Sequence, residues 1–200
     1  MTTLEEALRF VNKYGIVTLF PIRGLSFPNL YQATFGKSKE ERFQRAWEWA
    51  DYLSEKKKIH YGKLVRGQVT LISLEMFPHF YGIRRGCKLS KSAQKILGFL
   101  RRKEATSTTL LRKNLNFTGK AKKNEFTKAI DELQATFYVA IVSREKTPKM
   151  TYSYDLIERW MPENLIEESR KMNVAIAKEK IRSKLAESNM PGSLNGILPR

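Results

Sequence analysis

The chain has 200 residues, of which 42% are hydrophobic and 28% charged, a composition typical of a folded globular protein and not of a disordered chain or a fibre. Its 37 Lys and Arg residues outnumber 20 Asp and Glu residues, which gives a formal net charge of +17. Such a charge indicates a polyanionic partner, with nucleic acid as the first candidate and an anionic membrane surface as the second. One Cys and two His exclude a disulfide framework and a Cys/His zinc site, so we expect no metal and no cofactor.

The N-terminal sequence carries acidic residues, Glu5 and Glu6, where a signal peptide needs basic and then apolar residues. No apolar run reaches the length that a membrane span requires. We therefore expect a cytoplasmic protein that does not insert into membranes. The lone Cys87 lies among basic residues, and we interpret it as an ordinary thiol and not as a catalytic nucleophile.

The positive charge is concentrated in one part of the chain. Residues 1–83 carry 12 basic and 8 acidic side chains, residues 84–128 carry 14 and 2, and residues 129–200 carry 11 and 10. A disordered basic tail would contain few apolar residues, but the middle segment has regularly spaced leucine, isoleucine and phenylalanine side chains. The middle segment is therefore predicted to fold and to present a basic face.

Residues 1–83 show the patterns of helices and a hairpin. Helices are expected over residues 3–14, 29–34 and 38–55, a hairpin over 59–73 and a further short helix over 75–81. Thr3 and Ser38 are typical helix N-caps, and the hairpin run is rich in β-branched residues around a turn at Gly67. This order contains the elements of a winged helix, so we predict a winged-helix-like N-terminal domain over residues 1–83.

The second half of the sequence shows the same order of helices and strands, with clearer patterns. After the N-cap Ser90 we expect three helices, the second beginning at Thr106 or Ser107 and the third spanning 120–136, then strands over 137–143 and 150–154. Helical segments over 155–161 and 163–187 and a mobile tail over 188–200 complete the chain. Three helices followed by a hairpin are typical of a winged helix-turn-helix domain, which we place at residues 84–160, with a C-terminal helix and mobile tail over 161–200.

The fold class that these patterns predict is mainly α with small β-hairpins, arranged as a tandem or pseudo-tandem winged helix-turn-helix. In such a domain the third helix enters the major groove near its N-terminal end. With Phe126 at the centre of the buried stripe, four side chains lie about 100° to 200° away and face outward, namely Lys120, Asn124, Thr127 and Lys128. Asp131 and Glu132 occur only later in the helix.

The remaining basic residues of this region suit phosphate contacts. Lys122 and Lys123 flank the groove-facing set, and Asn124 has the geometry to pair with adenine. Further backbone contacts are expected from the second helix and the wing, through Arg112, Lys113, Arg144, Lys146 and Lys149. A solvated basic surface without a partner is the alternative interpretation. The shortage of acids in residues 84–128 favours DNA.

A family resemblance adds to this interpretation. The run Ile59–Tyr81, preceded by Trp47-Glu-Trp-Ala-Asp51, and the segment Tyr152–Pro162 resemble the AlkZ-related winged-helix proteins, distant relatives of the AlkZ/YcaQ DNA glycosylases that unhook interstrand crosslinks. The resemblance implies a DNA partner. Those glycosylases carry a Gln-x-Gln or Gln-x-Asp motif that corresponds best to Gly15–Pro21. Thr18 and Phe20 stand at its polar positions here, so no catalytic residue is carried over.

Glu48, Asp51 and His60 are weak candidates for catalysis. Carboxylates beside aromatic rings serve base extrusion and glycosidic cleavage, and two tryptophans lie close by in the sequence. The alternative is that the two acids are solvent-facing helix residues and that His60 is a strand-end histidine. We therefore predict a winged-helix protein that binds double-stranded DNA, in DNA repair or transcriptional control, with a DNA glycosylase acting on alkylated or crosslinked bases as the alternative. The N-terminal half either shapes a cleft over the DNA or forms a subunit contact in a homodimer.

Overall fold

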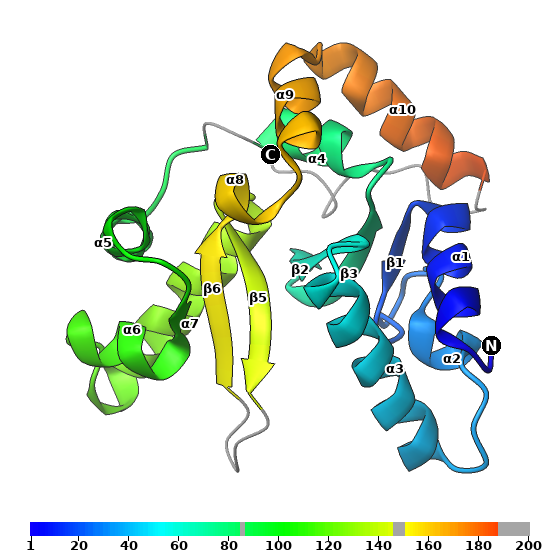
Figure 1. Ribbon diagram of the computed structural model, residues 1–200, viewed down its shortest axis with the longest axis horizontal. Helices are drawn as coiled ribbons and strands as arrows, with labels where there is room; N and C mark the ends of the chain where they lie inside the picture. Colours follow the sequence, from blue (N-terminus) through cyan, green and yellow to red (C-terminus); the bar gives the residue numbers. More distant parts are fainter. Residues whose placement is uncertain (85–86, 146–150, 188–200) are drawn as a thin grey trace.

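The computed structural model describes residues 1–84, 87–145 and 151–187. This part of the chain is mainly helical and contains two small antiparallel sheets of three strands each, one in each half of the molecule (Figure 1). The arrangement confirms the predicted fold class of helices with small β-hairpins.

The first half follows the predicted order. It comprises α1 (Leu4–Tyr14), β1 (Ile16–Thr18), α2 (Leu30–Ala33), α3 (Lys39–Glu55), β2 (Ile59–Val65), β3 (Gln68–Ser73) and α4 (Phe77–Arg84). Thr3 and Ser38 cap α1 and α3 as expected, because each side chain accepts a hydrogen bond from the backbone amide three residues later. The sequence did not predict that β1 pairs with β3, which makes a three-stranded sheet of the expected hairpin.

The second half comprises α5 (Lys91–Arg102), β4 (Thr106–Ser107), α6 (Thr108–Asn114), α7 (Gly119–Ala135), β5 (Val139–Glu145), β6 (Thr151–Leu156) and α8 (Ile157–Trp160). Ser90 and Ser107 cap α5 and α6. The two residues of β4 pair with β6, so this sheet also has three strands. The side chains of Phe126, Ile130 and Leu133 are buried on the inner face of α7, which agrees with the apolar spacing in the sequence.

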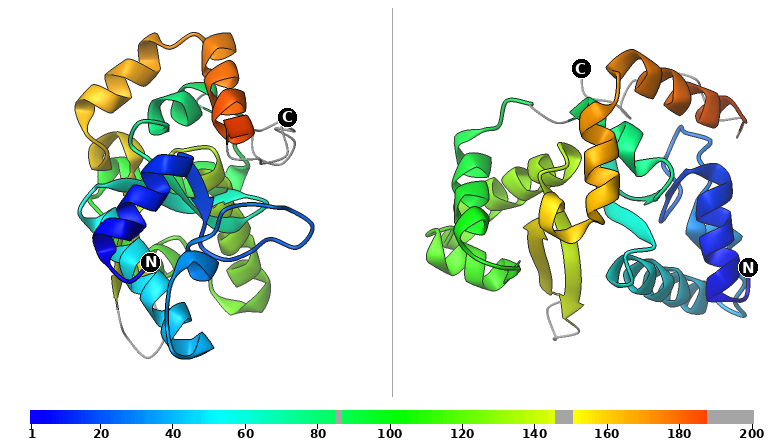
Figure 2. Two further views of the ribbon diagram at one scale, coloured as in Figure 1. Left: turned by 90° about the vertical axis from the view of Figure 1, so that its right-hand side faces the viewer. Right: turned by 45° about the horizontal axis from the view of Figure 1, so that its top comes forward.

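The helix expected over residues 163–187 is two helices, so this prediction was wrong. They are α9 (Glu163–Lys171) and α10 (Val174–Glu187). Met172 adopts an extended backbone, and the side chain of Asn173 accepts hydrogen bonds from the amides of Ala175 and Ile176, so that a new helix begins there. Both helices pack on α4 of the first half (Figure 2). The tail predicted to be mobile, 188–200, lies outside the described residues.

The two halves repeat one order of elements, helix, strand, helix, helix, strand, strand, and the strand orders β1-β3-β2 and β4-β6-β5 correspond. Helices α3 and α7 both have 17 residues and begin 80 positions apart. The turns that follow them also match. Lys57 and Phe137, again 80 positions apart, adopt left-handed backbones with φ of 53° and 57°, and their amides donate to Ser54 and Gln134.

The halves pack against each other reciprocally. Helix α7 of the second half lies on β2 of the first, and α3 of the first lies on β5 of the second. Strands β2 and β5 are neighbours at this junction, and one buried apolar cluster contains residues from both halves. Each helix is thus held at its C-terminal part by the opposite half. The division into domains at residues 83 and 160 stays a prediction.

Candidate nucleic-acid interface

The N-terminal part of α7 is exposed and polar. Its outward-facing residues include all six that the sequence assigns to DNA, namely Lys120, Lys122, Lys123, Asn124, Thr127 and Lys128. Lys122 forms an ion pair with Glu125 at 3.3 Å, and both side chains are largely exposed. The hydroxyl of Ser92 and then Lys122 lower the pKa of Glu125, so its carboxylate stays charged beside this surface.

The C-terminal part of α7 is covered by the first half of the chain. The Nζ of Lys63 on β2 lies 3.0 Å from Oδ1 of Asp131, and the backbone amide of Lys63 donates to Oε1 of Gln134 at 3.1 Å. Gln134 is buried. These contacts direct the acidic end of the helix toward β2 and leave its basic end open to a partner.

Helix α6, the second helix of the predicted motif, carries two basic residues, of which one is exposed and one forms a hydrogen bond within the protein. Lys113 on α6 is exposed. Arg112 is half-buried, and its Nε donates to the carbonyl oxygen of Phe117 in the turn between α6 and α7 at 3.3 Å. Arg112 thus supports the turn that orients α7, while the side chain of Lys113 points into solvent.

The wing residue Arg144 is directed inward. Its guanidinium forms an ion pair with Asp51 on α3, in which the two side chains are 8% and 15% exposed, and lies 4.8 Å from the centre of the Trp47 ring. A guanidinium buried in this way cannot also contact a phosphate, so we remove Arg144 from the expected DNA-contacting set. Lys146 and Lys149, the other two wing residues, lie outside the described residues.

The three weak candidates for catalysis lie in different environments. Glu48 is exposed and accepts a hydrogen bond from Gln44 at 2.9 Å. Asp51 belongs to the buried ion pair with Arg144, whereas His60 is enclosed among rings that include Phe77 and Phe137. Because successive strand residues point to opposite faces, His60 points away from its neighbour Tyr61, whose hydroxyl lies 3.5 Å from Asp51. The structure therefore does not bring the three candidates into one site.

Burial governs the charge of these groups. Loss of solvent lowers the pKa of His60 to about 3, with a smaller contribution from Arg84, so this histidine is neutral at pH 7. Burial also raises the pKa of Asp51, although Arg144 acts in the opposite direction. His60 is fully enclosed, whereas the side chain of Asp51 is half-buried and engaged with Arg144.

A cavity of about 190 Å³ lies beside the exposed face of α7, where the two halves meet. We call it the tyrosine cavity, because its walls include Tyr61, Tyr152 and Tyr154. Burial raises the pKa of all three tyrosines, which are therefore neutral. Lys123 and Thr127, two of the residues predicted to contact DNA, also line the cavity. The sequence gives no sign of this site, because its three tyrosines come from β2 and β6, which only tertiary packing brings together.

Comparison with known protein families agrees with this description. A family model described as AlkZ related matches residues 1–196. The chain belongs to the AlkZ-related family. The family indicates a DNA-related function, since AlkZ is a DNA glycosylase. Searches of curated proteins and of solved structures give no match.

In this AlkZ-related protein the segment aligned with the glycosylase motif is structural. Thr18 is buried in β1 and pairs with Thr70 of β3. The Phe20 ring stacks on Phe43 at 5.0 Å and contacts Tyr31.

Two further observations concern the described part of the AlkZ-related chain. In residues 1–84, 87–145 and 151–187, no three His, Cys, Asp or Glu side chains come together as ligands for a metal ion. Within the same residues, no helix combines the length and the apolar character that crossing a membrane requires.

Proposed function

We propose that this protein binds double-stranded DNA, with the N-terminal part of α7 in the major groove. The observation that carries the proposal is the division of α7 into an exposed basic part and a C-terminal part held by β2. A recognition helix needs this polarity, because its N-terminal residues contact base edges while the rest fixes the helix to the domain.

The surroundings of α7 support the proposal. Residues 84–128 carry 14 basic and 2 acidic side chains, so the helix lies in the most positive part of the chain. The element order α5-β4-α6-α7-β5-β6 and the strand order β4-β6-β5 support a winged helix-turn-helix. The corresponding order in residues 1–83 supports the tandem arrangement. In this proposal Lys113, Lys120, Lys122, Lys123 and Lys128 contact phosphates, and Asn124 contacts a base.

Salt dependence tests the proposal directly. Neutralisation of about five phosphates, one by each of these lysines, gives a plot of log K against log salt concentration with a slope of about −4 to −5. Fluorescence anisotropy of a labelled duplex at several salt concentrations measures this slope. A flat salt dependence would exclude the proposed interface.

The variant Lys123→Glu locates the interface. We expect it to weaken duplex binding by about 1–2 kcal/mol at low salt, because a cation beside the backbone becomes an anion. Lys171→Glu, a charge reversal at an exposed lysine of α9, is the matched control and should have a much smaller effect. Equal effects of the two reversals would mean that only the net charge of the protein matters.

A glycosylase activity is the second proposal, supported by the family of the chain. Incubation with alkylated or crosslinked duplex, followed by detection of abasic sites, separates an enzyme from a binding protein. DNA repair is the biological role that the family favours over transcriptional control. The cytoplasmic location and the homodimer stay predictions, the latter open to light scattering of the purified protein.

A further inference from the structure

The tyrosine cavity opens beside the surface proposed to meet DNA. Lys123, Thr127 and Asp131 follow one another at four-residue intervals on α7, so they form one stripe along the helix. All three line the cavity, and the first two belong to the DNA-facing set. The stripe therefore connects the proposed groove-facing surface with the interior of the cavity.

The size and the walls of the cavity suit a flat aromatic group. Its volume is about 190 Å³, and engineered protein cavities of about 150 Å³ bind benzene. Tyr152 and Val69 are the partly exposed apolar walls, and Phe126, Ile141, Tyr61 and Tyr154 are buried behind them. Stacking of a base on aromatic rings stabilises nucleic-acid complexes without selecting one base sequence.

Polar groups at the cavity can form hydrogen bonds with the edge of a nucleic-acid base. The Lys63 and Asp131 ion pair lies at the cavity with both side chains about one-third exposed, so that it is accessible to solvent. The hydroxyl of Thr108 donates to the carbonyl oxygen of Tyr152 at 2.9 Å and fixes one wall. Neutral tyrosine hydroxyls both donate and accept hydrogen bonds, as recognition of a base edge requires.

We propose that the tyrosine cavity receives one purine or pyrimidine base extruded from the bound duplex. This inference rests on the proposed DNA binding and adds a site for an unpaired base to it. Extrusion of a paired base costs stacking and pairing energy, whereas a mismatched, damaged or bulged base is extruded at lower cost. The cavity thus gives the protein a preference for duplexes with a weakly paired nucleotide.

The test compares a paired duplex with the same duplex carrying a single-nucleotide bulge, using the full chain. We expect the bulged duplex to bind at least about tenfold more tightly, because extrusion of its unpaired base costs little pairing and stacking energy. The bulged base is then replaced by 2-aminopurine, whose fluorescence should fall on binding as it stacks on Tyr152. Equal affinities for the two duplexes would overturn the inference and leave the proposed DNA binding intact.

Two variants locate the effect. Val69→Phe fills the cavity from the β3 side and should abolish the preference for the bulge, while Val174→Phe, the same change at an exposed valine on α10, should keep it. Tyr152→Leu removes a ring and should abolish the fluorescence decrease. Circular dichroism and binding of the paired duplex establish that the variants fold.

The remaining outcomes are equally decisive. A preference for the bulge that persists in both Val69→Phe and Tyr152→Leu would place the base elsewhere and overturn the inference. If the wild-type protein binds neither duplex at low salt, the proposed function and this inference both fail.

Discussion

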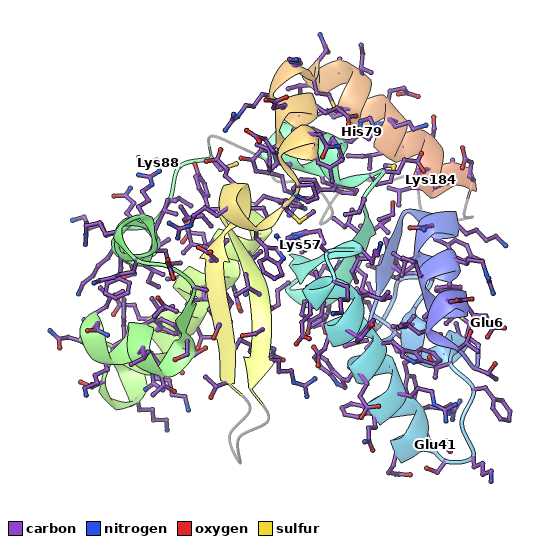
Figure 3. All side chains as sticks on the ribbon, viewed as in Figure 1. Glu6, Glu41, Lys57, His79, Lys88 and Lys184 are labelled. Carbon is purple, nitrogen blue, oxygen red and sulfur yellow. The ribbon has the colours of Figure 1, made fainter. Side chains whose placement is uncertain are left out.

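Helices α3 and α7 occupy equivalent places in the two halves but differ where they are exposed. Residues 80 positions apart correspond, and Asp51 and Asp131, which face the junction between the halves, are the same residue type. On the outer faces, Glu40 and Glu48 of α3 stand where α7 has Lys120 and Lys128. Figure 3 shows the similarly acidic Glu41 near the start of α3 and Lys57 at the junction. The C-terminal part of each helix holds the two halves together. The corresponding exposed residues nearer the N-terminus are acidic in α3 and basic in α7.

The two junction ion pairs differ in burial, and this gives the largest expected effect. Arg144→Met should lower the free energy of unfolding by about 3 kcal/mol, because it leaves the half-buried Asp51 without its ion-pair partner. Urea denaturation at pH 7 measures the loss. The double variant Arg144→Met/Asp51→Leu should regain most of it, since an apolar pair replaces both charges.

The corresponding contact between Lys63 and Asp131 is the control for this prediction. Its side chains are 37% and 34% exposed, so solvent screens the interaction. We expect Lys63→Met to change the free energy of unfolding by no more than about 1 kcal/mol. Similar losses for Arg144→Met and Lys63→Met would contradict the distinction between a buried and a screened junction pair.

The second prediction concerns His60, which stands where the other half has the buried Ala140. The unfolded chain binds a proton at the ordinary pKa of 6.5, while the folded protein does so only near pH 3. Stability from the neutral histidine is therefore fully present above pH 6.5 and is lost as the pH falls toward 3. Between pH 7 and pH 5 the loss amounts to about 2 kcal/mol.

The variant His60→Leu isolates this contribution. Its free energy of unfolding should fall by about 2 kcal/mol less than that of the wild type between pH 7 and pH 5, because the titrating group is gone. Urea denaturation at the two pH values gives the comparison. The same pH dependence in both proteins would show that His60 does not govern stability in this range.

The smallest effect comes from exchanging charges between the two helices. The double variant Lys128→Glu/Glu48→Lys keeps the net charge of +17 but makes α7 more negative and α3 more positive by two charge units each. We expect about tenfold weaker duplex binding at low salt, measured by anisotropy. Glu48→Lys alone, which raises the net charge, should not weaken binding. An unchanged affinity of the double variant would show that the two faces are equivalent for DNA.

Local signals in the sequence predict much of the fold. Ser38 and Ser90 are caps that accept a hydrogen bond from the backbone amide three residues later, so the starts of α3 and α5 follow from the sequence. β4, in contrast, exists only because the distant strand β6 pairs with it. Elements that depend on a distant partner leave little trace in the local pattern.

The same distinction applies to the candidate site. The outward direction of Lys120 and Lys128 follows from helical periodicity and the position of Phe126. The inward direction of Arg144 does not, because it depends on Asp51 and Trp47, about 90 residues earlier in the chain. Charge composition predicts that a basic surface exists, but only packing decides which cations belong to it.

The reciprocal packing of α7 on β2 and of α3 on β5 has a consequence for folding. Neither helix can detach from the opposite half without exposing the apolar cluster that both halves share. The molecule should therefore melt in a single cooperative transition, with equal calorimetric and van't Hoff enthalpies, although each half has a sheet of its own. Contacts that join the two repeats thus make them one thermodynamic unit.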